Sequence, residues 1–136
     1  MNKVSFFLLL LFSVFSNSQN NGKTQYGEND TIVYRNPQVE AEFSNISEKI
    51  PTYITKQIIN SDAYLDNSIS GKFYISFIVE KDGSLNKIEV LGGNDFEKNV
   101  ILGIIQKIPK LLSAEHEGYH VRSSISFPII IKKNNE

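Results

Sequence analysis

The chain has 136 residues, contains no cysteine and carries a formal net charge of −1 at pH 7. Its length suits one small domain and is too short for two, and without cysteine that domain must depend on its hydrophobic core rather than on disulfides. The nearly neutral charge and the lack of a basic patch exclude nucleic acid as an expected partner.

The first 18 residues are typical of a cleaved secretory signal peptide. Lys3 supplies a positive start, residues 4–15 are almost wholly apolar, and small and polar residues follow. The apolar run is shorter than the roughly 20 residues that a membrane-spanning helix needs. We therefore expect cleavage after Ser18 and an exported domain, with a retained membrane anchor as the alternative.

Residues 19–33 are polar and predict a flexible linker, in which 31–34 could form a short extended piece. The domain is expected over 34–132, with a tail at 133–136. Apolar residues at helical spacing between Ile46 and Ile58 predict a first helix. Because Pro51 is tolerated only in a first turn, the regular helix should run from about Ile50 to Asn60, with Asn45 or Ser47 as its cap. Residues 61–70 are expected to form a loop.

A β-hairpin follows. Apolar side chains alternate with mostly polar ones from Phe73 to Val79, which is typical of a strand with one buried face. Residues 81–84 form a turn in which Asp82 and Gly83 supply the positive φ angles of a tight hairpin. Residues 85–91 return as the second strand.

A second helix is predicted from about Phe96 to Ile108, capped by Asn94 or Asp95 and ended by Pro109. Its expected buried face consists of Phe96, Val100, Ile101, Ile104, Ile105 and Ile108. A final strand over 121–132 contains Pro128, which favours a sheet edge. The pattern predicts an α+β fold, with two helices packed on one face of a three-stranded antiparallel sheet.

One motif suggests metal chemistry. His116, Glu117 and His120 spell His-Glu-x-x-His, in which two histidines one helical turn apart bind zinc and the glutamate activates water. Gly118 weakens a helix at this point, strand-forming residues begin at Val121, and the chain offers no suitable third ligand downstream. We interpret the motif as a polar loop, with a zinc hydrolase as the remote alternative.

Other chemical groups have structural explanations. The carboxylates of Glu80, Asp82 and Glu89 suit a solvated hairpin, and Gly92 with Gly93 suits a strand-to-helix turn. Three serines near the end of the chain lack a suitably placed general base that could activate them as nucleophiles. We interpret them as the exposed face and flank of an edge strand: Ser123, Ser124 and Ser126. We predict a protein that is not an enzyme and needs neither a metal nor a cofactor.

The hairpin resembles that of the TonB C-terminal domain family. The resemblance rests on Gly71, the alternating strand, the Lys-Asp-Gly-Ser turn and the return strand ending at Gly92-Gly93. Ile108-Pro109-Lys110, Gly118 with Val121, and Phe127-Pro128-Ile129 are similar to further family elements. The resemblance covers about 34–132 and is most specific at the hairpin.

The resemblance implies a periplasmic domain that binds another protein. Family members engage an extended segment of a TonB-dependent outer-membrane receptor beside their last strand, which is strand addition. Carried onto this chain, the partner-binding residues are Val121, Arg122, Ser123, Ser124, Ile125, Ser126 and Phe127. The same exposed edge could support a homodimer.

Departures from the family pattern shape this expectation. The Tyr-Pro pair after the first helix is absent, and Leu111 replaces an aromatic residue. With a cleaved leader and a short linker, the chain would not span the periplasm as an energy transducer does. We therefore expect a free adaptor, competitor or chaperone-like binder.

Overall fold

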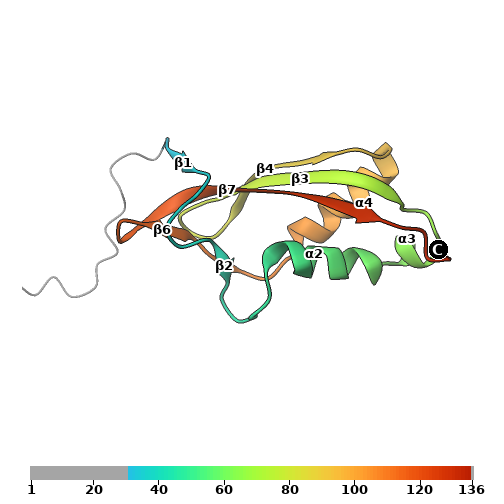
Figure 1. The fold of residues 1–136 in the computed structure, drawn as a ribbon, viewed down its shortest axis with the longest axis horizontal. Helices are drawn as coiled ribbons and strands as arrows, with labels where there is room; N and C mark the ends of the chain where they lie inside the picture. The colour runs from blue at the N-terminus through green and yellow to red at the C-terminus, as the bar shows by residue number, and fades with distance from the viewer. Residues whose placement is uncertain (1–30, 136) are drawn as a thin grey trace, which may run out of the picture.

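A computed structural model describes residues 31–135 as an α+β fold in which helices pack against one face of a sheet (Figure 1). The predicted signal peptide and most of the predicted linker lie outside the described residues. In chain order the elements are β1 (Val33–Tyr34), β2 (Glu42–Phe43), α2 (Ile50–Ile59), α3 (Asp62–Leu65), β3 (Gly71–Val79), β4 (Leu85–Leu91), α4 (Asp95–Gln106), β5 (Leu111–Leu112), β6 (Ala114–His116) and β7 (Tyr119–Ile131).

The main sheet has five strands. Its strand order is β1-β7-β3-β4, and β6 pairs with the start of β7. β3 is antiparallel to both β4 and β7, whereas β1 is parallel to β7. The prediction of a three-stranded, purely antiparallel sheet was therefore wrong in strand number and in direction. The added strands have two or three residues each, too few to produce a recognisable alternation in the sequence.

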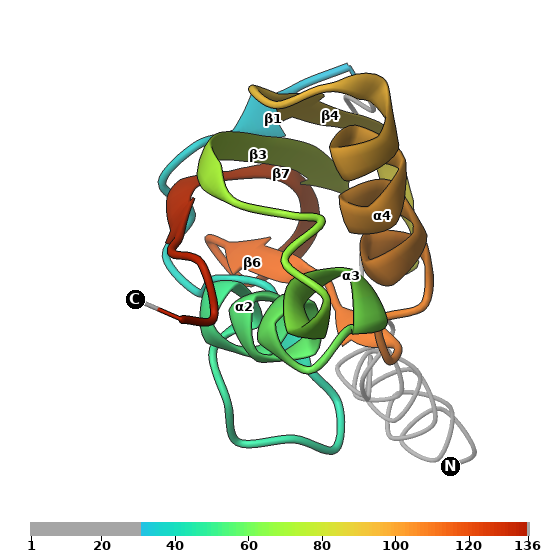
Figure 2. The ribbon, with the colours of Figure 1, turned by 90° about the vertical axis from the view of Figure 1, so that its right-hand side faces the viewer.

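The core lies between the sheet and the helices. Phe73, Ile75, Phe77 and Val79 of β3 are at most 1% exposed, as their alternation predicted. Viewed along the strands, α4 and α2 lie on the same side of the sheet (Figure 2). Lys72, next to Phe73 on β3, is exposed, so the two side chains lie on opposite faces of the strand. Burying one face of each strand in this way fixes its register, because a slip of one residue would expose the whole apolar set.

The helices begin and end near the predicted positions. α2 starts after Lys49 with Pro51 in its first turn, and it has no side-chain cap, so the prediction of Asn45 or Ser47 as the cap was wrong. α3 falls in the segment predicted to be a loop; the Ser61 side chain caps it by accepting a hydrogen bond from the backbone N–H of Tyr64. The four residues of α3 are too few to show a helical period.

α4 has a complete capping box. The Asn94 side chain accepts from the Glu97 backbone N–H at 2.9 Å, and the Glu97 carboxylate accepts from the Asn94 N–H at 3.1 Å. Ile101 and Ile105 are fully buried, as expected of this helix. Phe96 was predicted to be buried but is 55% exposed, because at 3.6 residues per turn it points away from the side of the helix that carries Ile101 and Ile105.

The turn between β3 and β4 depends on a single glycine. Gly83 has a φ of 83°, and Asp82 does not share this left-handed conformation, contrary to the prediction for both residues. Asp82 instead accepts hydrogen bonds from the backbone N–H and the hydroxyl of Ser84, at 2.9 and 2.6 Å. A Cβ on Gly83 would fall on the carbonyl oxygen of Leu111, so the turn also packs tightly against β5.

The segment before α2 is held in place by three backbone pairings. β1 pairs with β7, Val39 pairs with Glu115 next to it, and β2 pairs with β5 as a separate two-stranded sheet. β1 includes Val33, the last residue of the predicted linker, so ordered pairing starts slightly earlier than the predicted domain. Within residues 31–135, no helix is long and apolar enough to cross a membrane.

Candidate functional site

The two edges of β7 differ in how much of their length is paired. On one side β3 pairs with β7 continuously, from Ser123 to Ile131. On the other side β1 covers only Arg122 and Ser123. In the part of the chain that the structure describes, no strand pairs with this second edge from Ser124 onward, which leaves a free edge of eight residues, 124–131.

The predicted binding strand lies only partly on this free edge. Arg122 and Ser123 pair with β1, and Val121 pairs with Ala114 of β6, so these three positions lie outside the free edge 124–131. Ser123 was expected to be exposed, but it is 2% exposed, and its hydroxyl has no hydrogen-bond partner among the described residues. The remaining predicted residues, Ser124, Ile125, Ser126 and Phe127, do lie along the free edge.

Pro128 indicates which backbone groups point outward. Antiparallel strands alternate residues whose N–H and C=O point to one neighbour with residues whose groups point to the other. Pro128 has no N–H to donate to β3, so its backbone groups belong on the outer side. By the same alternation, the N–H groups of Ser124, Ser126 and Ile130 also point to the free edge, where an added strand would find them.

A groove runs beside this edge. It is open to solvent, has a volume of about 1550 Å³ and is lined along β7 by Ser123–Ser126, which we call its floor. One wall is the segment before α2 together with the start of that helix, including Pro37–Glu42 and Ile46–Pro51, and the outer face of β3 and β4 forms the other margin. An extended peptide is the shape of ligand that a groove beside an unpaired strand can hold.

The polar groups of the groove floor are small and neutral. Ser124 and Ser126 flank Ile125, while both positive and negative side chains stand around the walls: Arg35, Glu40, Glu42, Glu48, Lys49, Lys87 and Glu89. Glu48 is paired with Lys56 of α2. This mixture gives no strong field of one sign, so main-chain hydrogen bonding rather than charge would dominate the affinity for an added segment.

An ion pair fixes β7 next to the covered end of the edge. The Arg122 guanidinium donates two hydrogen bonds to the Glu80 carboxylate, from Nε at 2.7 Å and from a terminal nitrogen at 2.9 Å. These bonds lower the pKa of Glu80 below its ordinary value of 4.5, partly opposed by desolvation, and Asn86 adds a further bond. The pair connects the end of β3 to β7, so Arg122 has a structural role at this position.

The His-Glu-x-x-His motif lies in a β-hairpin rather than on a helix. Glu117 and Gly118 are its two turn residues, with φ angles of 52° and 81°. Register pairs His116 with Tyr119 and Glu115 with His120. Since successive residues of a strand face opposite sides, His116 and His120 point to opposite faces of the hairpin. They therefore lack the shared helical face on which the zinc motif depends.

Each histidine has its own neighbours. The ring of His116 packs on Tyr34 with centroids 4.6 Å apart. Nδ1 of His120 lies 2.7 Å from the Ser113 hydroxyl, and its Nε2 lies 3.8 Å from Glu115. Within residues 31–135, no three His, Cys, Asp or Glu side chains are grouped so that they could hold a metal ion.

The other carboxylates considered in the sequence are not brought together. Asp82 accepts hydrogen bonds from Ser84 within the turn, and these bonds, first from the Ser84 hydroxyl and then from its backbone N–H, lower the pKa of Asp82 below the ordinary 3.8. Glu89 is exposed on the outer face of β4, and Glu80 is bound to Arg122. Gly92 and Gly93 form the turn into α4, both with positive φ.

The sequence signal for β1 was present but ambiguous. The sequence predicts at most an extended piece at residues 31–34, and nothing in them indicates a partner strand or a parallel direction. The covered positions of β7 could therefore not be separated from the free ones before the fold was known. Comparisons with protein-family models, with curated proteins and with solved structures found no match to this chain.

Proposed function

We propose that this chain is an exported protein-binding domain that takes up an extended segment of a partner by strand addition along β7, from Ser124 to Ile131. The observation that supports this most directly is the eight-residue free edge opening into the groove. Unpaired N–H and C=O groups in a row form a template for another strand. The edge is not blocked by a charged side chain between Ser124 and Ile131.

We expect the main chain of the partner segment to contribute most of the binding affinity. Hydrogen bonds to the outward groups of β7 would give the affinity, and alternate side chains of the incoming segment would face either the α2 wall or the outer sheet face. The resemblance to TonB C-terminal domains supports an outer-membrane receptor as the source of the segment and the periplasm as the location. The protein would then act as an adaptor, a competitor or a chaperone-like binder.

Nuclear magnetic resonance would test the proposal. Isotope-labelled residues 19–136 are titrated with peptides of roughly ten residues copied from the extended segments of outer-membrane receptors. Amide shifts concentrated at Ser124, Ser126 and Ile130 support strand addition. If no shifts occur at about 1 mM peptide, binding is weaker than about −4 kcal/mol and the proposal fails for that partner class.

A matched pair of peptides makes the test specific to the main chain. In an added strand, every second N–H of the peptide points to β7 and the others point away. N-methylation of the inward set should abolish binding, because each lost hydrogen bond costs about 1 kcal/mol. N-methylation of the outward set should leave binding nearly unchanged. Equal effects of the two patterns would indicate a side-chain-only contact.

A further inference from the structure

The sheet face that points away from the helices carries an apolar row. In the register of the strands, Tyr74 of β3 is flanked by Leu91 on β4 and by Pro128 on β7. Ile130 lies one step further along β7, opposite Lys72. Leu91, Tyr74 and Ile130 are 59%, 45% and 68% exposed. Leu91, Tyr74 and Pro128 form one row across three strands, and Ile130 lies beside it. Together they make a continuous apolar patch rather than scattered exposed residues.

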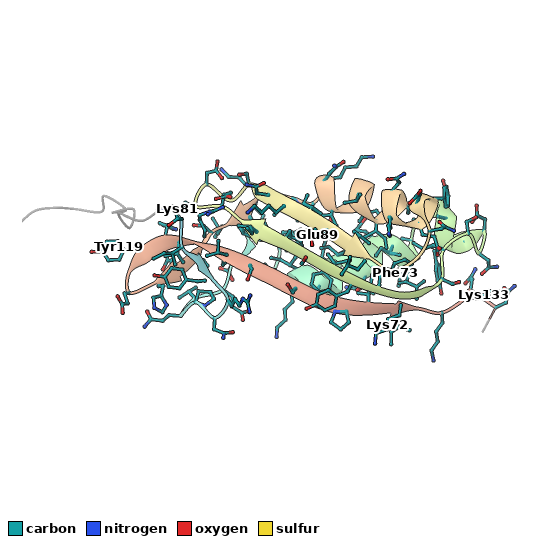
Figure 3. The ribbon with its side chains drawn as sticks, turned by 90° about the horizontal axis from the view of Figure 1, so that it is seen from above. Lys72, Phe73, Lys81, Glu89, Tyr119 and Lys133 are labelled. Atoms are coloured by element: carbon teal, nitrogen blue, oxygen red, sulfur yellow. The ribbon has the colours of Figure 1, made fainter. Side chains whose placement is uncertain are left out.

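Opposite charges stand on the two sides of this row. Lys72 lies two residues before Tyr74 on β3, on one side of the row. Glu89 of β4 lies on the other side of the row, two residues before Leu91 and opposite Ser76. Both charged residues are exposed, and no ion pair holds either of them within the described part of the chain. Figure 3 shows Lys72 and Glu89 at separate places along the sheet. A copy of the face turned end for end would therefore present Glu89 to Lys72 and Lys72 to Glu89.

We propose that this outer face is a dimer interface occupied by a second copy of the chain, packed face to face about a two-fold axis near Tyr74. The two apolar rows cover each other, and two symmetric Lys72–Glu89 pairs form at their margins. A two-fold interface requires a self-complementary surface, and an apolar centre between opposite charges meets that requirement. This arrangement differs from pairing of free β7 edges and does not depend on peptide binding.

Charge reversal provides the test. The association constant of the full chain without peptide is measured by sedimentation equilibrium for the wild type, Lys72→Glu, Glu89→Lys and the double reversal. Each single reversal places like charges together twice and should weaken the dimer by roughly 10-fold or more. The double reversal restores opposite pairs and should return the constant to within about 3-fold of the wild type. Both positions are exposed, so circular dichroism should confirm unchanged folding.

The natural absence of cysteine allows a second, independent readout. A single Tyr74→Cys substitution near the axis should form an oxidised dimer rapidly, whereas Lys107→Cys, just after α4 on the opposite side of the molecule, should not. A wild type that stays monomeric up to about 1 mM overturns the proposal. So does a dimer that is unaffected by both single reversals, or binding of the monomer to anionic phosphatidylglycerol vesicles through Tyr74 and Leu91 without self-association.

Discussion

At the scale of single residues, the Glu80–Arg122 pair gives a pH-dependent contribution to stability. Two hydrogen bonds from Arg122 lower the pKa of Glu80 below 4.5 in the folded state. A lowered folded pKa means that the contribution is complete above the ordinary pKa and is lost as pH falls through the lower folded value. Since both side chains are partly exposed, solvent screening limits the contribution of the pair to the free energy of unfolding to about 1 kcal/mol.

Glu80→Gln should therefore lower the free energy of unfolding by about 1 kcal/mol at pH 7, and this difference should be smaller at pH 3, below the ordinary pKa of 4.5. Urea unfolding at the two pH values measures it. Glu40→Gln is the matched control, because that carboxylate is exposed and no ion pair holds it within residues 31–135. A Glu80→Gln effect that persists unchanged at pH 3 would show that packing, not the ion pair, is responsible.

Two glycines provide opposite expectations for the same substitution. Gly83 needs a positive φ, and a Cβ there would meet the Leu111 carbonyl, so Gly83→Ala should destabilise the fold by about 2 kcal/mol or more. Gly103 lies inside α4 with open space around it, so Gly103→Ala should stabilise by about 0.5–1 kcal/mol. Thermal unfolding of the two variants beside the wild type measures both. Shifts in the same direction would contradict this assignment.

Residue chemistry could be predicted where a local pattern determines it. The apolar alternation of β3 identified a buried face, and the position of Pro109 identified the end of a helix. The role of Glu80 could not be predicted, because its partner Arg122 is 42 residues away. Nor does a short motif specify geometry: His116 and His120 are separated by a turn that puts them on opposite faces.

At the scale of elements, the β6–β7 hairpin contains a correctable strain. Its turn needs a positive φ at both central residues, and Glu117 adopts 52° although only Gly, Asn and Asp do so readily. Glu117→Asn should therefore stabilise the protein by about 0.5 kcal/mol, because Asn-Gly is the preferred pair for such turns. Chemical denaturation measures the gain. Glu117→Val should have the opposite effect, and a neutral result for both would contradict the strain.

Long elements could be predicted, and very short ones could not. β3, β4, β7, α2 and α4 each have seven or more residues, enough for a period to emerge from the sequence. β1, β2, β5 and β6 have two or three residues each. β1 pairs with β7 and β2 with β5, partners distant in sequence, whereas β6 pairs locally with β7 across a two-residue turn. This is why the free edge was expected in β7 but its starting point at Ser124 was not.

At the scale of the whole molecule, the two proposed surfaces adjoin on one sheet and share residues: Tyr74 and Glu89 line the groove, and Pro128 and Ile130 belong to the free edge. The β7 edge offers main-chain groups, whereas the face around Tyr74 offers side chains. Both are left open because the helices cover only the opposite face (Figure 2). When helices cover one face of a sheet, its other face and its outer edge stay accessible. One small domain can therefore have a main-chain contact at the edge and a side-chain contact at the face.

Native-state hydrogen exchange should reproduce this organisation. β3 lies between two strands and its inward side chains are almost fully buried, so its amides should exchange only when the whole protein unfolds. β1 and β2 have two residues each and should exchange by local opening. Along β7 the pattern should alternate: Ile125, Phe127 and Ile129 slow, with Ser124, Ser126 and Ile130 fast.

The alternation on β7 is the decisive part of that measurement. A free edge requires that the fast amides become slow when a peptide is added, while the slow amides change little. Uniformly slow exchange along β7 in the peptide-free monomer would mean that its edge is already covered, and strand addition would then need displacement of the covering segment. Uniformly fast exchange would mean that the β3–β7 ladder opens locally, which conflicts with the nine-residue pairing from Ser123 to Ile131.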